Sequence, residues 1–459
     1  MNQAHMISLV RSGEVGKLVG AKCLRFLDGA TTLVDPDVLT EDYHQLLEQA
    51  AVDSLGVDTA GYLNLGKSRN DQVATALRMH LKRVLLRVVS NALDLQASII
   101  RLAREQGRVI MPGYTHLQHA QPITLAHHMF AYFDSLERDV ERLFQLYGRV
   151  DASPMGSAAL AGTSVRVNRA EVAGLLGFSR LVDNAMDAVS SRDVELEALA
   201  CFAIMMSSMS RISEELVLWS SREFSFVQIP DEYAATSSIM PQKKNPIVAE
   251  VARAKSGSVL GAFSAALTVV KGLPYSYNLD LQEVTPHLWR AVDDISGSLS
   301  LLAGMMGGLK FNPAAIARSM EGDFSTATSL ANYLVTEHRI SFRQAHSIVG
   351  GLVRRAVTDG SSLEQMAETH LSYLFKEETG RTISIPRRTI HSVLSARTSL
   401  DEITSTGGSN PKFIPGGLES RTKSIDSFKK RLRTLRSGFE NSERTLARSV
   451  KSMTREVKN

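Results

Sequence analysis

Cysteine and proline are scarce in this sequence of 459 residues. Two cysteines, Cys23 and Cys201, cannot build a disulfide framework, and neither belongs to a Cys-x-x-Cys pair. That usage is typical of a reducing compartment. Prolines are 13 of 459 residues, about 2.8% against an average near 5%. Because proline interrupts helices, this scarcity favours a helical chain.

Long hydrophobic runs are also missing. The longest apolar stretches, such as 259–270, are interrupted by serine and threonine and fall short of the roughly 18 residues that span a membrane. The amino-terminal segment has no basic-then-apolar signal pattern. We therefore expect a cytoplasmic protein with no membrane partner.

The net charge of +4 is unevenly distributed. Residues 421–459 carry twelve basic and four acidic side chains, whereas the rest of the chain is net negative. A basic segment suggests a nucleic-acid partner. Apolar residues recur through this tail at steps of three and four: Ile425, Phe428, Leu432, Leu435 and Phe439. The pattern predicts an amphipathic helix that docks on the protein's own fold with its basic residues in solvent, so we expect no nucleic acid.

Helical periodicity dominates the rest of the chain. Apolar residues recur at helical steps through five long segments: 71–105, 124–150, 190–223, 246–270 and 286–306. Long helices with short polar connections are typical of a bundle rather than of alternating strands and helices. We predict an all-α fold.

Boundaries follow from the glycine and proline breaks. We predict an N-terminal helical domain at 1–107, a central long-helix bundle at 108–350 and a C-terminal helical domain at 351–459 that ends in the basic helix. The last domain has more glycine and proline interruptions of its helical pattern than the others. Turns are predicted there at Gly380, Gly407-Gly408, Pro411, Pro415 and Gly416-Gly417.

The first of three polar segments is residues 66–72, which open the first long helix. Ser68, Asn70 and Asp71 are ordinary residues for a helix N-cap. The alternative is an anion site, built from the exposed backbone N–H groups of a helix start together with Arg69 and Asn70.

The second polar segment, 112–122, contains His116 and His119. With His127 and His128 nearby, these histidines raise the hypothesis of a metal site, but no cysteine or carboxylate shares their spacing. A histidine in a tight turn beside threonine and glutamine is better placed as an acid or a base.

The third polar segment, 236–246, holds two serines, two lysines and an asparagine. It could be a polar loop ahead of a helix that begins at Pro246. Equally, these side chains could supply a base and a clamp for an anion.

Ser-Ser-Ile-Met-Pro-Gln-Lys-Lys-Asn-Pro at 237–246 resembles the signature loop of the fumarase/aspartase superfamily. Other segments resemble the argininosuccinate lyase family: Lys-Ser-Arg-Asn-Asp-Gln-Val at 67–73, Tyr-Thr-His-Leu-Gln at 114–118, Ser-Pro-Met-Gly-Ser-Ala-Ala-Leu-Ala-Gly-Thr at 153–163, and Asp-Leu-Gln-Glu at 280–283. The matches are dense between residues 66 and 283, near half of the chain.

The resemblance implies an anti β-elimination that splits argininosuccinate into arginine and fumarate. It implies that Ser237 is the base, with its alkoxide favoured by Lys243 and by backbone N–H groups of the loop. Lys243 and Asn245 would hold the substrate carboxylate. His116 would act on the departing guanidine nitrogen, directly or through a water, with Glu250 as its partner.

The resemblance further implies six substrate-binding residues: Ser68, Arg69, Asn70, Thr115, Tyr277 and Gln282. No metal and no organic cofactor are implied. The fold implied is a three-domain one whose long-helix bundle forms the core of a homotetramer, with each active site shared between three subunits.

Several positions depart from the family pattern. Asn64-Leu65 replaces a histidine and a threonine, Thr236 replaces a glycine, and Thr285 replaces a lysine. Two alternatives therefore stay open. One is a sister lyase acting on adenylosuccinate or another N-substituted succinate, and the other is a catalytically silent, crystallin-like structural protein.

Overall fold

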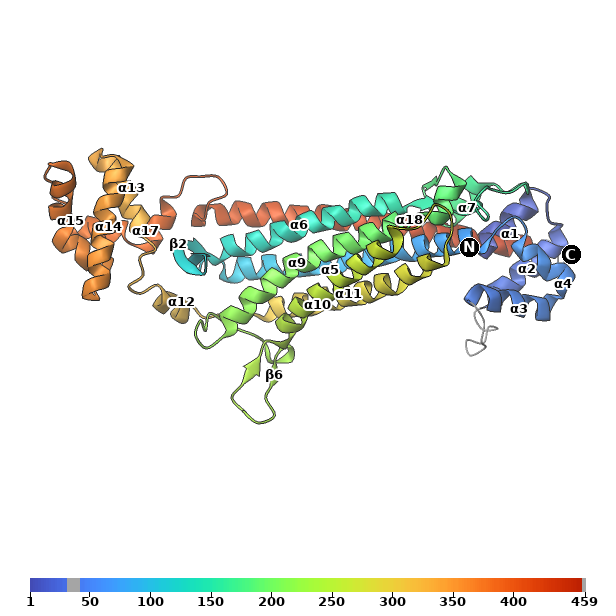
Figure 1. The fold of residues 1–459 in the computed structure, drawn as a ribbon, viewed down its shortest axis with the longest axis horizontal. Helices are drawn as coiled ribbons and strands as arrows, with labels where there is room; N and C mark the ends of the chain where they lie inside the picture. The colour runs from blue at the N-terminus through green and yellow to red at the C-terminus, as the bar shows by residue number, and fades with distance from the viewer. Residues whose placement is uncertain (31–41, 456–459) are drawn as a thin grey trace.

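The structure is a computed structural model that describes residues 1–30 and 42–455. Five long helices lie side by side in an elongated bundle (Figure 1): α5 (Arg69–Gln106), α6 (Leu125–Val150), α9 (Asp193–Ser220), α10 (Ile247–Val270) and α11 (Val284–Gly308). Their ends agree with the five predicted helices within three residues. The all-α prediction is confirmed.

The bundle core is built from the apolar faces that the periodicity predicts. Leu85, Phe133, Phe202 and Ile295, from four of the helices, have no exposed surface. Helices α6 and α10 run against α5, α9 and α11, so each connection reverses the chain (Figure 1). Polar segments between the helices are thereby placed at the two ends of the bundle.

Shorter helices cover both ends (Figure 1). Near the start of α5 lie α1 (Asn2–Arg11), α2 (Lys17–Gly29), α3 (Tyr43–Leu55), α4 (Val57–Ala60), α7 (Arg169–Leu175) and α8 (Ala185–Ser190). Towards the other end lie α12 (Pro313–Ser319), α13 (Ala327–His338), α14 (Phe342–Asp359), α15 (Leu363–Thr379), α16 (Arg387–Val393) and α17 (Ala396–Asp401).

Each group of shorter helices has a hydrophobic core of its own. Helix α5 lies inside the range predicted for the N-terminal domain, 1–107, yet its apolar face is part of the bundle core. The domain boundaries at 107 and 350 stay predictions about folding units.

The last helix, α18 (Ile414–Arg455), packs along the bundle. Ile425, Leu432 and Phe439 are buried, as the amphipathic pattern predicts. The turn predicted at 415–417 is wrong, because α18 already includes these residues. A proline is tolerated in the first turn of a helix, where its missing N–H would have no partner. A Cβ on Gly417 would lie 2.5 Å from Phe130, so glycine permits this close contact.

The described residues also form four small two-stranded pairs, which the sequence did not predict. They are β1 (Ile110–Thr115) with β2 (Gln118–Thr124), β3 (Ala152–Ser153) with β4 (Arg180–Leu181), β5 (Val227–Gln228) with β8 (Lys310–Phe311), and β6 (Ala235–Thr236) with β7 (Lys244–Asn245). Two of these pairs, β1–β2 and β6–β7, carry polar segments singled out in the sequence.

One described helix, α9, has the length and the apolar composition of a membrane-crossing helix, although the apolar runs of the sequence did not predict one. Half of its most apolar window is buried inside the protein. A core helix of a bundle meets the same criterion, and α9 packs between α6 and α10.

Candidate active site

The predicted site residues lie at opposite ends of the bundle (Figure 1). Residues 68–70, 277 and 282 lie at the end where α5 and α11 begin. Residues 115–116 and 237–250 lie at the other end. At 1.5 Å per residue, the 38 residues of α5 extend roughly 57 Å. A single chain therefore does not bring the two groups together.

At the start of α5, Ser68 and Asp71 form the capping box that Ser-x-x-Asp predicts. The Ser68 hydroxyl accepts a hydrogen bond from Asn70 N (3.4 Å), and Asp71 accepts one from Ser68 N (2.9 Å). The second Asp71 oxygen accepts the N–H groups of Gly156 and Ala158, both at 3.0 Å. Burial raises the pKa of Asp71, and these donors oppose that rise. Asp71 thus fixes the loop after β3 against the helix start.

Arg69 and Asn70 are held at this end by other parts of the chain. Arg69 Nε lies 3.0 Å from Asp42 Oδ2, and Asn70 Nδ2 donates to Ala159 O at 3.0 Å. Beside them, burial lowers the pKa of Lys67 to about 8. A helix N-terminus flanked by such donors can bind a carboxylate.

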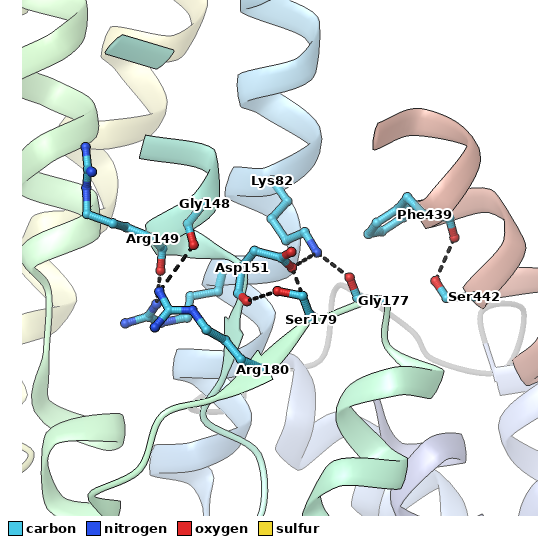
Figure 2. Close-up of polar contacts among 10 residues, drawn as sticks. Lys82, Gly148, Arg149, Asp151, Gly177, Ser179, Arg180, Phe439 and Ser442 are labelled. Atoms are coloured by element: carbon cyan, nitrogen blue, oxygen red, sulfur yellow. Dashed lines mark hydrogen bonds and ion pairs between the residues drawn. The ribbon is translucent and has the colours of Figure 1, made fainter. Parts of the chain in front are cut away.

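A buried lysine anchors the base of the loop after β3 (Figure 2). The Lys82 ammonium donates to a carboxylate oxygen of Asp151 and to the carbonyl oxygen of Gly177. The Lys82 side chain is only 1% exposed, and burial lowers its pKa. Asp151 also accepts from Ser179 N at 3.3 Å, which ties β3 to β4. The ammonium lies 4.8–5.7 Å from the ring centres of Tyr147, Phe178 and Phe439.

At the opposite end, Thr115 and His116 lie at the tip of the β1–β2 hairpin. Thr115 pairs with Gln118, so the loop has two residues, His116 (φ 55°) and Leu117 (φ 56°). Two positive φ values define a type I′ turn, which usually holds glycine or asparagine. The His116 side chain is exposed, and among residues 1–30 and 42–455 it has no hydrogen-bond partner.

Ser237 begins an exposed loop between β6 and β7 that projects from the bundle (Figure 1). Its Oγ accepts the N–H groups of Ile239 (3.3 Å) and Met240 (3.0 Å), and its own N–H donates to Lys243 O at 3.3 Å. Two backbone donors on one hydroxyl oxygen stabilise negative charge on it. Ile239 is 86% exposed, so the loop tip packs on little of its own chain.

The remaining residues of this segment are placed without direct contact with His116. The Lys243 side chain is exposed, whereas Lys244 pairs with Asp231 at 2.6 Å. Asn245 lies on β7, and Glu250 lies in the first turn of α10. Within the described part of the chain, no hydrogen bond joins Glu250 to His116.

Tyr277 and Gln282 lie on either side of the start of the 3-10 helix η4 (Leu279–Glu283), just before α11. Gln282 Nε2 donates to the Tyr277 hydroxyl at 2.9 Å. The structure therefore brings these two predicted substrate residues together.

The hypothesis of a metal site is not supported by the described residues. No group of three or more His, Cys, Asp or Glu side chains in residues 1–30 and 42–455 could hold a metal ion. His119 and His128 instead lie 2.8 Å and 2.7 Å from the carboxylates of Asp323 and Glu215.

Three residues shape the α5 end beyond what the sequence predicted: Asp71, which was named only as an N-cap residue, and Lys82 and Arg169, which were missed. Arg169 donates to the carbonyl oxygens of Met155 and Val182, at 3.1 and 3.0 Å. Asp71 had a usable signal in its capping spacing. Lys82 had one too, since it lies on the apolar face of α5. Arg169 had none.

Comparisons with known proteins identify the family. A model of the lyase family matches residues 33–261, and a model of the argininosuccinate lyase C-terminal region matches residues 324–401. Argininosuccinate lyase of Methanoculleus marisnigri is 44% identical over 92% of this chain and 85% of its own length. The same enzyme of Methanothermobacter thermautotrophicus is 42% identical over 94% of this chain and 92% of its own. A solved EDDS lyase variant with bound fumarate is 27% identical, covers 99% of this chain and 90% of its own, and superposes with a TM-score of 0.92.

A long-helix bundle with polar segments at both ends is the architecture of the fumarase/aspartase superfamily of lyases. Within that superfamily, the chain belongs to the argininosuccinate lyase family.

Proposed function

We propose that the protein splits argininosuccinate into arginine and fumarate by an anti β-elimination. A base removes the weakly acidic Cβ proton while donors stabilise the dianionic aci-carboxylate that forms. An acid protonates the guanidine nitrogen that departs. The names of relatives at 42–44% identity support the proposal, as do the polar segments retained at both ends of the bundle.

The observation that carries the proposal is the hydrogen bonding of Ser237. A serine hydroxyl is a poor base in water and needs surroundings that favour its alkoxide. The N–H groups of Ile239 and Met240, at 3.3 and 3.0 Å from Oγ, supply such surroundings. Lys243 adds positive charge, and with Asn245 it holds the substrate carboxylate.

His116 acts on the departing nitrogen. Its exposed place at a hairpin tip suits a group that reaches into a site formed with another subunit. Glu250 of a different subunit orients the imidazole and fixes its tautomer. Thr115, the α5 start at 68–70, and the pair Tyr277 and Gln282 bind the substrate.

The active site is shared between the subunits of a homotetramer. The two ends of α5 lie roughly 57 Å apart. A substrate-sized site cannot contain residues from both ends of the same chain, so this separation supports the assembly. Helix α10 also supports this assembly. Its residues 256–270 include no charged side chain, although Leu260 is 57% exposed and Leu267 is 44% exposed. An uncharged, partly apolar helix face is typical of an interface. Superfamily enzymes are typically oligomeric.

A complementation experiment tests the sharing of sites. Ser237→Ala and Asn70→Ala each inactivate a different segment. If sites are shared, tetramers reassembled from the two inactive variants contain some sites with both segments intact, and activity returns. Mixtures that stay inactive after subunit exchange, shown by mass spectrometry, would contradict shared sites.

A sister lyase acting on another N-substituted succinate is the second candidate. The similarity to EDDS lyase, whose structure matches 99% of this chain, favours this second candidate. The sequence also departs from the family pattern at Asn64-Leu65 and Thr285. These departures favour an altered site for the arginine half of the substrate. Incubation with argininosuccinate, adenylosuccinate and EDDS, followed by ultraviolet absorbance of fumarate, separates the candidates. Turnover of either other compound without argininosuccinate would overturn our choice.

Cytoplasmic localisation is also proposed, and the two cysteines support it. Cys23 and Cys201 are buried and unpaired with each other, and burial raises the pKa of each thiol to about 11. Neither thiol needs an oxidising compartment.

A further inference from the structure

The hairpin that carries His116 holds an unfavourable backbone at its tip. His116 and Leu117 both have φ near 55°, in the left-handed region, and neither is glycine. Such a conformation costs roughly 1–2 kcal/mol for each non-glycine residue. A strained turn persists only where neighbouring contacts determine its shape.

His119, three residues beyond His116, supplies such a contact. Its Nδ1 lies 2.8 Å from Asp323 Oδ2, and its Nε2 lies 3.2 Å from the Tyr114 hydroxyl. Tyr114 and His119 face each other across the two strands, with ring centres 5.0 Å apart and edge-on. Asp323 belongs to the segment between α12 and α13, so His119 links the hairpin to a distant part of the chain.

Asp323 is itself held in place. Its Oδ1 accepts hydrogen bonds from Ser325 N (3.1 Å) and Ser325 Oγ (2.7 Å), and Ser325 is only 4% exposed. The free oxygen of the carboxylate is thereby aimed at the His119 ring. The side chains of His119 and Asp323 are 27% and 14% exposed, so water competes weakly for this contact.

One arrangement of protons that fits these contacts has His119 neutral. An ionised Asp323 only accepts, so Nδ1 of a neutral His119 donates to it, and Nε2 accepts from the Tyr114 hydroxyl. Burial, with the nearby Asp323 charge, raises the pKa of Tyr114 to about 12, so its hydroxyl keeps its proton at neutral pH. Both ring nitrogens of His119 are thus used within the protein.

We infer that His119 is a positioning residue, which with Asp323 and Tyr114 holds the hairpin so that His116 meets the substrate. The inference rests on the proposed role of His116. A cavity of about 510 Å³ lies beside the tip, lined by Leu117 and Gln118 as well as by His119 and Asp323. The tip has this open space on one side, and the contact between His119 and Asp323 lies at its border.

Steady-state kinetics of His119→Ala and Asp323→Asn test the inference. We expect kcat to fall about 10- to 100-fold in each, because small misplacements of a reacting group have effects of that size. KM should change less than threefold, since His116 acts in the transition state. His119→Gln, whose amide can still donate to Asp323, should recover part of kcat.

A double-mutant cycle and a matched control complete the test. In a His116→Gln background, His119→Ala should lower kcat no further, because its effect passes through His116. His128→Ala removes a similar contact, to Glu215 at 2.7 Å on the bundle, and should leave kcat unchanged. Additive losses, an equal loss in His128→Ala, or unchanged kcat in both hairpin variants would overturn the inference. A wild-type enzyme that turns over none of the succinates would overturn the proposed function and this inference together.

Discussion

Replacing Lys82 with methionine removes a buried charge while keeping most of the side-chain volume. Lys82 is 1% exposed, and its ammonium binds Asp151 and the Gly177 carbonyl. Removing one partner of a buried ion pair costs about 3–5 kcal/mol, because the other charge is left without compensation. Asp151 is 17% exposed, so water relieves part of that cost. The unpaired Gly177 carbonyl adds about 1–3 kcal/mol.

The apolar methionine offsets some of these losses inside the cage of Tyr147, Phe178 and Phe439. We therefore expect Lys82→Met to lower the free energy of unfolding by about 3–5 kcal/mol. Asp151→Asn should cost a similar amount, since it strands the ammonium. The double variant should cost clearly less than the sum, because no buried charge is left unpaired.

Urea denaturation of the wild type, both single variants and the double variant measures these differences. A matched control is Lys423→Met, whose ion pair with Glu419 is exposed on both sides and contributes little. A Lys82→Met variant as stable as the control, or single losses that simply add in the double variant, would refute the reasoning.

Ser237→Ala should lower kcat by about 10²- to 10⁴-fold without changing the sedimentation coefficient, and activity close to wild type would place the base elsewhere. Burial lowers the pKa of His5 from 6.5 to about 4. As the pH drops through this range, His5 is protonated in the unfolded chain before it is protonated in the folded one, so the free energy of unfolding should fall between pH 6.5 and pH 4. That loss, up to about 3 kcal/mol, should be missing in His5→Leu, and equal slopes in chemical denaturation at several pH values would contradict it. Gly417→Ala should cost about 1–3 kcal/mol, because its Cβ would meet Phe130 at 2.5 Å, and an unchanged melting temperature would show that the contact relaxes freely.

The long helices were predictable because each buries one continuous apolar face against its neighbours. Periodicity over some thirty residues, as in α5, outweighs local ambiguity. The start of α18 was mispredicted for the opposite reason. Pro415 and the following glycines look like a turn locally. A proline is equally compatible with the first turn of a helix, and Gly417 permits the close contact with Phe130.

The segments that carry the candidate site were predictable from the sequence. Their positions relative to one another in space were not. The signature residues around Ser237 and Asn70 are recognisable from local motifs. Their separation by the length of α5 follows from the fold. The contact between His119 and Asp323 joins residues 204 positions apart, and no spacing or periodicity predicts such a pair.

Product analysis with argininosuccinate tests the proposed activity most directly. Purified protein should consume the substrate and release arginine and fumarate in equal amounts, and Ser237→Ala at the same concentration should release neither at a comparable rate. Substrate left unconsumed by the folded, oligomeric wild type, or fumarate formed without arginine, would contradict the proposal.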